Sequence, residues 1–118
     1  MIKINETSRE LTKVEKYLMT ASPAMVSMKD VEDGTSISVL AWCTFTDVKE
    51  TTGESVDLLS ILTTSSEVYS CQSETFKREF LTIVNLMEND DFSVIKFSGK
   101  TKAGRDFINC ILDVSSIE

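Results

Sequence analysis

A run of basic residues is the part of this sequence best suited to bind a charged ligand. Positions 96 to 105 read Lys-Phe-Ser-Gly-Lys-Thr-Lys-Ala-Gly-Arg, with four cations and no acid. The whole chain has 12 Lys and Arg against 19 Asp and Glu, a formal charge of −7, so without these four cations the remainder carries −11. Cations gathered on a turn between two apolar runs are typical of a phosphate-binding site. A solvated hairpin turn has the same composition, so the place of this turn in the fold must decide between the two interpretations.

The side chains that commonly perform catalysis are scarce in this sequence. It has no histidine, which is the commonest general base and metal ligand. The cysteines lack the CxxC-type spacing of a zinc site, and Gly99-Lys100-Thr101 is not a P-loop because Val94 stands where the motif requires a glycine. No spacing singles out a pair of carboxylates. The sequence therefore predicts a non-enzymatic protein without cofactor or metal.

Length and composition predict a single domain over residues 1–118. The hydrophobic and charged fractions, 42% and 26%, are those of an ordinary globular protein, and the chain is long enough to bury a core without disulfides. The sequence has no run long enough to span a membrane and no signal-peptide pattern, so we expect it in the cytoplasm. The three cysteines are widely spaced in apolar surroundings and are expected to be buried free thiols: Cys43, Cys71 and Cys110.

The hydrophobic pattern predicts a helix, three strands, a second helix and two further strands. The first helix is expected over 8–22, with Ser8 as its cap and Ser22-Pro23 at its end. From position 35 to 46 the period becomes two, and one strand face is expected to be buried. That face holds Ile37, Val39, Ala41, Cys43 and Phe45. The later elements are strands at 55–63 and 67–72, a helix capped by Ser73 with Phe76, Phe80, Ile83, Val84 and Met87 toward the core, and strands at 92–98 and 106–114.

This order of elements predicts a mainly β fold, a five-stranded Greek-key barrel of the oligonucleotide/oligosaccharide-binding (OB) type spanning 35–114. Its helix would lie between strands three and four, and the N-terminal helix would be an addition. In that fold the loops between strands one and two and between strands four and five flank the binding face. These loops are 47–54 and 99–104 here, so the basic turn falls where a ligand is expected.

Single-stranded nucleic acid is the ligand that combines phosphates with bases able to stack on aromatic rings. The cations predicted to contact it are Lys96, Lys100, Lys102 and Arg105, with Lys49 from the other loop. The predicted stacking residues are Trp42, Tyr69, Phe97 and Phe107, although Trp42 and the two phenylalanines also fit a core position. Because the chain as a whole is acidic, we expect moderate and strongly salt-dependent affinity.

Several segments resemble the small single-stranded-DNA-binding proteins of phages and mobile elements of Gram-positive bacteria. The most specific is Phe97-Ser-Gly-Lys-Thr-Lys-Ala-Gly-Arg-Asp-Phe-Ile-Asn-Cys110, and the others are Glu10 to Tyr17 with Ser22-Pro23, and Leu59-Ser-Ile-Leu-Thr followed by Glu67-Val-Tyr. The resemblance covers most of the chain. It implies a non-enzymatic, largely sequence-independent protein that coats and protects single-stranded DNA during phage or plasmid replication in a bacterial host. It implies no cofactor, metal, membrane or small-molecule substrate.

Two other functions are compatible with the same sequence. An acidic protein-interaction module, such as an inhibitor that imitates DNA phosphates, would use the carboxylates of 30–33 and 88–91. An enzyme could carry carboxylates that only the fold brings together. The sequence decides neither between DNA and RNA nor the oligomeric state, although the edge of strand 92–98 and the N-terminal helix are surfaces that could support a homo-oligomer.

Overall fold

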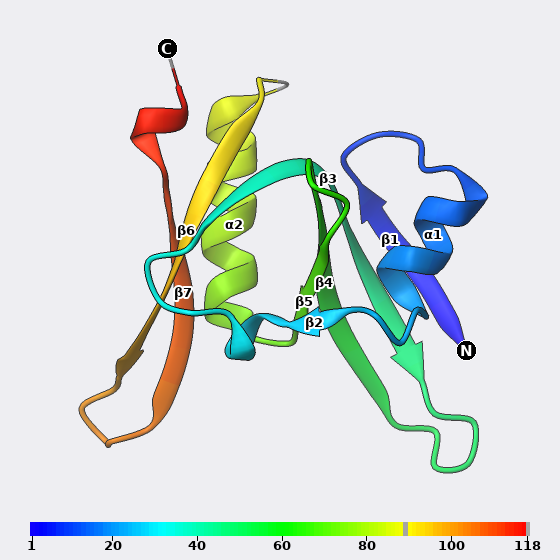
Figure 1. The fold of residues 1–118 in the computed structure, drawn as a ribbon. Coiled ribbons are helices and arrows are strands. Elements are labelled where there is room, and N and C mark those ends of the chain that lie inside the picture. Colours follow the sequence, from blue (N-terminus) through cyan, green and yellow to red (C-terminus); the bar gives the residue numbers. More distant parts are fainter. Residues whose placement is uncertain (89, 118) are drawn as a thin grey trace.

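The structure, a computed structural model, describes residues 1–88 and 90–117 and consists mostly of strands, with two α-helices (Figure 1). Seven strands form one curled sheet. In chain order the elements are β1 (Ile2–Thr7), α1 (Lys13–Thr20), β2 (Val26–Ser27), the 3-10 turn η1 (Met28–Asp30), β3 (Ser36–Val48), β4 (Ser55–Thr63), β5 (Val68–Cys71), α2 (Glu74–Met87), β6 (Phe92–Lys100), β7 (Asp106–Leu112) and the 3-10 turn η2 (Val114–Ser116).

The neighbours in the sheet follow the order β2-β5-β4-β3-β6-β7, and β1 pairs with β3. From β5 to β7 this neighbour order is compatible with the predicted Greek-key barrel. A closed barrel would also need β5 to pair with β7, and within residues 1–88 and 90–117 these two strands form no ladder. The sheet is therefore a curled half-barrel, and the OB assignment stays a prediction. The predicted edge at 92–98 is covered over its first part, because β6 pairs with β3 from Phe92 to Ile95 and with β7 on its other side.

A β-bulge in β3 gives the sheet two cores on opposite faces. The register of β3 against β4 shifts between Val39 and Ala41, and a one-residue shift moves all later side chains to the other face. The five residues predicted to share one face are therefore divided, although all five are buried. Before the bulge, Ile37 and Val39 belong to the core beneath α2, which Trp42 also joins. After it, the side chains of Ala41, Cys43 and Phe45 belong to a second core that includes residues before and within α1.

The N-terminus forms a strand where the sequence analysis expected only the start of a helix. Ser8 does not cap a helix, because its N–H donates to the Trp42 carbonyl at 2.9 Å and its Oγ accepts from the Trp42 N–H at 3.0 Å. The helix begins later, where Thr12 and Glu15 form a reciprocal capping box. Hydrogen bonds from Arg9 and from the Thr12 N–H lower the pKa of Glu15 from 4.5 to about 2. A two-residue strand, β2, was also missed.

The helix α2 agrees with its prediction at its start and in its buried face. The Ser73 Oγ accepts from the Phe76 N–H at 3.2 Å, and the core-facing stripe contains Phe76, Phe80 and Ile83, all buried. All three cysteines are buried free thiols, as predicted. Burial raises the pKa of Cys43 and Cys71 to about 11 and that of Cys110 to about 12. Neither helix in the described chain is long and apolar enough to cross a membrane.

Candidate nucleic-acid interface

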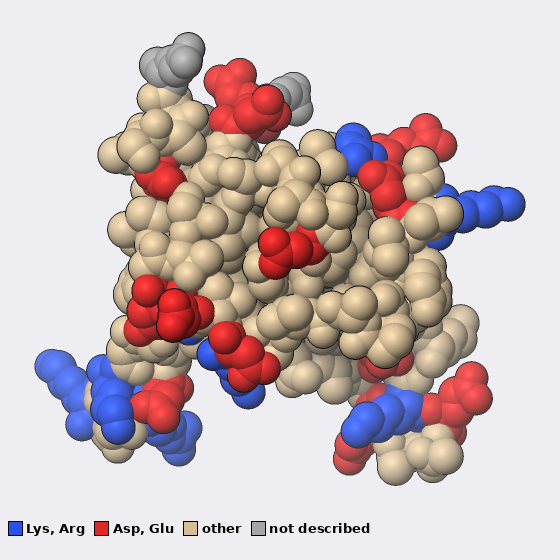
Figure 2. Space-filling model, viewed as in Figure 1, with Lys and Arg blue, Asp and Glu red and all other residues tan. Residues whose placement is uncertain are grey.

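The basic turn lies at the tip of the β6–β7 hairpin, which projects from the body of the molecule. The turn is closed by a hydrogen bond of 2.9 Å in which the Thr101 N–H donates to the Arg105 carbonyl. Gly104 supplies a φ of +83°, which other residues rarely adopt. The side chains of Lys102 and Arg105 are exposed. Figure 2 shows Lys and Arg side chains gathered on this hairpin at the lower left, with acidic side chains among them and where the hairpin joins the body. The hairpin tip therefore presents cations to solvent, as the sequence predicted.

Lys100 is also exposed but has an acidic neighbour across the hairpin. Its Nζ lies 3.5 Å from an Asp106 carboxylate oxygen, and the two side chains are 72% and 83% exposed. An ion pair this exposed contributes little stability, so a phosphate can displace the carboxylate at low cost. Lys100 thus stays available to an anionic ligand, although less freely than Lys102.

Lys96 does not belong to this exposed group, because its side chain is buried. Its Nζ donates to the Val31 carbonyl at 2.6 Å and lies 3.0 Å from the Asp33 carboxylate. The Ser98 hydroxyl donates to the same carboxylate at 2.6 Å, and these bonds from Ser98 and then Lys96 lower the pKa of Asp33. The ammonium group therefore fastens the loop before β3 to β6 and faces the interior. The expectation that it lies with the other cations of the turn is wrong in this structure.

Replacing Lys96 by methionine should separate this anchoring role from a phosphate contact. We expect Lys96→Met to lower the free energy of unfolding by roughly 1–3 kcal/mol, since buried hydrogen bonds to a charged group are lost while the half-exposed Asp33 can be hydrated. The dependence of DNA affinity on salt should not change. A phosphate-binding lysine would instead reduce the slope of log K against log salt by about 0.7. Thermal unfolding and salt titrations of DNA binding measure the two effects, and a reduced slope would contradict the anchoring role.

The outer face of the β6–β7 hairpin carries both phenylalanines that the sequence singled out. Paired residues of an antiparallel ladder share a face, and here Phe97 faces Asn109 while Gly99 faces Phe107. The two rings are therefore diagonal neighbours on one face, and both are half-buried. A Cβ atom on Gly99 would lie 2.7 Å from the Phe107 Cζ, so only glycine lets that ring lie against the strand. The rings lie next to the cationic tip, at positions where bases could stack.

Lys49 lies on the second predicted loop, between β3 and β4. This loop is closed by a hydrogen bond of 2.8 Å in which the Lys49 N–H donates to the Glu54 carbonyl, and the side chains of the loop are exposed. Figure 1 shows the β3–β4 turn at the lower right and the β6–β7 turn at the lower left, both extending beyond the body. Because Glu50 and Glu54 lie on the same loop, its charge is mixed. Lys49 is thus placed on the side where the basic hairpin projects.

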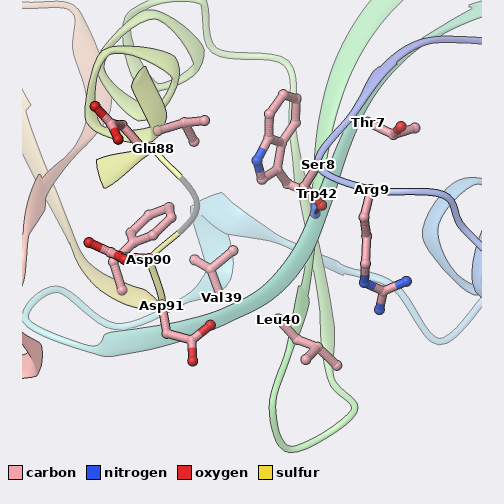
Figure 3. Close-up of a pocket in the computed structure, with 11 residues that line it drawn as sticks. Thr7, Ser8, Arg9, Val39, Leu40, Trp42, Glu88, Asp90 and Asp91 are labelled. Atoms are coloured by element: carbon pink, nitrogen blue, oxygen red, sulfur yellow. Dashed lines mark hydrogen bonds between the residues drawn. The ribbon is translucent and has the colours of Figure 1, made fainter. Parts of the chain in front are cut away.

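Trp42 is more buried than the two phenylalanines, whereas Tyr69 is half-buried like them but is bound to a carboxylate. The Trp42 indole is 8% exposed and packs edge-on against Phe80, with ring centroids 6.1 Å apart. It lines a pocket whose rim carries Glu88, Asp90 and Asp91, as Figure 3 shows. The Tyr69 hydroxyl donates to a Glu67 carboxylate oxygen at 2.6 Å, and its ring packs against the core. Carboxylates beside both residues oppose the approach of a phosphate chain.

The acidic segments proposed for a DNA mimic do not form one surface. In the segment 30–33, the Asp33 carboxylate is bound to Lys96 and Ser98. In the segment 88–91, Asn89 lies outside the described residues, while Glu88, Asp90 and Asp91 line one side of the Trp42 pocket. Over the described part of the chain, no group of three or more cysteine or acidic side chains is arranged to hold a metal.

A hairpin with cations at its tip and half-exposed rings on its face offers both groups that single-stranded nucleic acid requires. The family model described as Phage Single-stranded DNA-binding protein matches residues 4–113. The chain therefore belongs to the Phi29 phage single-stranded DNA-binding protein family, whose members bind single-stranded DNA during phage replication and are not enzymes. No curated protein and no solved structure matches the chain.

Proposed function

We propose that the protein binds single-stranded DNA along the outer face of the β6–β7 hairpin, largely without regard to sequence, and so protects the strand during replication. The observation that carries the proposal is the placement of Phe97 and Phe107 on one face beside the exposed cations of the turn. Stacking on a ring is tolerant of sequence because every base has a π face. Phosphate contacts carry no sequence information either.

In this arrangement the phosphate chain passes the hairpin tip, where Lys102 and Arg105 are exposed and Lys100 is held only by a solvated ion pair. Lys49 contributes from the β3–β4 loop. Lys96 acts indirectly, by fixing the base of the hairpin through Asp33. Trp42 is left out of the proposed contacts because it is buried, and Tyr69 because its hydroxyl is bound to the Glu67 carboxylate.

The proposal includes a partly open barrel of OB type, formed by β3, β4, β5, β6 and β7. Two observations support it: the neighbour order of these five strands and the projection of both turns on the same side of the molecule. Residues of the α1 core cover the other face of β3 and β4 at Ala41, Cys43 and Phe45, so that face is closed to DNA. This leaves the β6–β7 side for the strand.

The experiment that tests the function compares single- and double-stranded DNA of equal length in an electrophoretic shift assay at low and at physiological salt. We expect a shift with oligo-dT and with mixed-sequence single strands of similar affinity, and a much weaker shift with the duplex. Binding should weaken steeply as salt rises. Equal affinity for single strand and duplex, or a strong preference for one sequence, would contradict the proposal.

A further inference from the structure

The half-barrel leaves a seam between the end of β5 and the start of β7, and this seam contains a pocket of about 670 Å³. One side is formed by Gln72 and Ser73 and the other by Asp106, Phe107 and Ile108. Lys29 from η1 and Ser98 from β6 complete the lining. The pocket thus lies directly below the basic turn, and Phe107 forms part of its wall.

The walls of this seam pocket are held in place by polar contacts. The Ser98 hydroxyl donates to Asp33 at 2.6 Å and lies 3.3 Å from the Lys96 Nζ. The Ser73 hydroxyl caps α2 and also lies 3.4 Å from the Ile108 carbonyl, so it links the two sides of the seam. Gln72, Lys29 and Asp106 are exposed at the rim, and the Asp106 carboxylate lies 3.5 Å from the Lys100 Nζ. A pocket of this size with fixed walls and a few polar groups at its mouth is typical of a small-ligand site.

From this geometry we infer that the seam pocket receives one unpaired base of the bound DNA strand. The inference rests on the proposed function and adds a site to it. A strand that stacks on Phe107 and crosses the β7 edge arrives at the mouth of the pocket, where the Gln72 amide offers both a donor and an acceptor to a base edge. Lys29, which follows the strand paired with β5 and so lies on the same side as Gln72, can meet the phosphate of the same nucleotide.

The seam pocket would also explain a preference for single strands. A base that is paired and stacked in a duplex must first be extruded before it can enter a pocket, and this extrusion costs several hydrogen-bonding and stacking contacts. An unpaired base enters without that cost. The discrimination between single strand and duplex would then come from the seam, whereas the cations of the turn attract both.

The buried native thiols allow the seam to be blocked in the folded protein. In Gln72→Cys the new thiol is exposed, whereas Cys43, Cys71 and Cys110 are buried and should not react with a maleimide. The variant is measured before and after alkylation with N-ethylmaleimide, which adds bulk without charge. Asn85→Cys, alkylated in the same way at an exposed position on α2, is the matched control. The ligands are oligo-dT and an abasic strand of equal length.

We expect alkylation of Gln72→Cys to reduce the preference for oligo-dT over the abasic strand by at least about fivefold, with an unchanged salt dependence. The alkylated Asn85→Cys protein should keep the full preference. If the alkylated Gln72→Cys protein keeps it as well, the seam inference is overturned while the proposed function stands. If Gln72→Cys does not fold, Lys29→Cys permits the same comparison from a neighbouring position on the rim. Failure of the unmodified wild-type protein to bind oligo-dT would contradict the proposed function itself.

Discussion

Replacing Lys100, Lys102 and Arg105 together by alanine should weaken binding to oligo-dT roughly 100-fold at low salt and weaken it equally for every sequence. Each phosphate contact to a single strand contributes about 0.7 to the slope of log K against log salt. Because Lys100 has an acidic neighbour, at least two contacts should be lost, and the slope should fall by at least about 1.4. Fluorescence polarisation over a range of salt concentrations measures both quantities.

The matched control removes three exposed cations elsewhere, in Lys13→Ala, Lys16→Ala and Arg78→Ala combined. This variant has the same net charge as the hairpin variant but keeps the turn intact. We expect its affinity to fall by only a few-fold, through the general field of the protein. If both variants lost affinity to the same extent, DNA would be responding to net charge and the hairpin would not be the phosphate site.

Replacing Phe97 and Phe107 together by alanine should weaken binding at least about 30-fold without changing the salt dependence. A base stacked on an aromatic ring contributes roughly 1–3 kcal/mol, and two rings are removed. No charge is altered, so the number of released counterions stays the same. The cation variant should change both the affinity and the salt slope, whereas the phenylalanine variant should change the affinity alone. This difference distinguishes the role of the cationic tip from that of the ring-bearing face.

Loss of packing must be distinguished from loss of stacking in that experiment, because both rings are half-buried. Phe97→Leu with Phe107→Leu keeps apolar bulk while removing the flat ring, and should still lose most of the affinity. Leu86→Ala, at a side chain 72% exposed on α2, serves as a control for trimming an exposed apolar residue. Tight DNA binding by a folded double-leucine variant would exclude stacking at these positions.

The parts of the fold that depend on local sequence were predicted well. The strand at 55–63, the cap at Ser73 and the buried stripe of α2 are all found where the pattern placed them. Each depends on a period or a cap that is visible within a few residues. The order of α2 and of the five later strands along the chain was also predicted correctly, because each shows a local pattern. The family resemblance in the last hairpin is confirmed by the match over residues 4–113.

The features that were missed depend on partners far away in the chain. Lys96 is buried because Val31 and Asp33, more than sixty residues earlier, supply its acceptors. The one local signal of this burial was that Lys96 shares a strand face with Phe92 and Val94, which are both buried. The strand β1 alternates Ile2 and Ile4 with polar residues, yet it is stable only because β3 offers an edge. β2 has only two residues, too few to show the alternating hydrophobic pattern of a strand.

The candidate site was predicted only in part, because the sequence does not show which of several cationic or aromatic side chains are buried and which are exposed. The exposed cations of the turn and the face shared by Phe97 and Phe107 follow from a hairpin register. The burial of Trp42 does not, because it follows from the shift in register ahead of it. Whether the residues placed at the interface contact DNA stays a prediction for the experiments above.

The bulge in β3 also decides where the length of this chain can vary. Its extra residue is Leu40, because Val39 pairs with Thr63 and Ala41 pairs with Leu62, the adjacent residue of β4. Deleting Leu40 would restore regular alternation and leave Trp42 facing α2 and Ala41 facing the core beside α1. Deleting one residue between Ala41 and Phe45 would instead turn the rest of the strand over and move the Phe45 ring out of its core. Insertions and deletions should be tolerated at the hairpin tips and rejected in that later part of the strand.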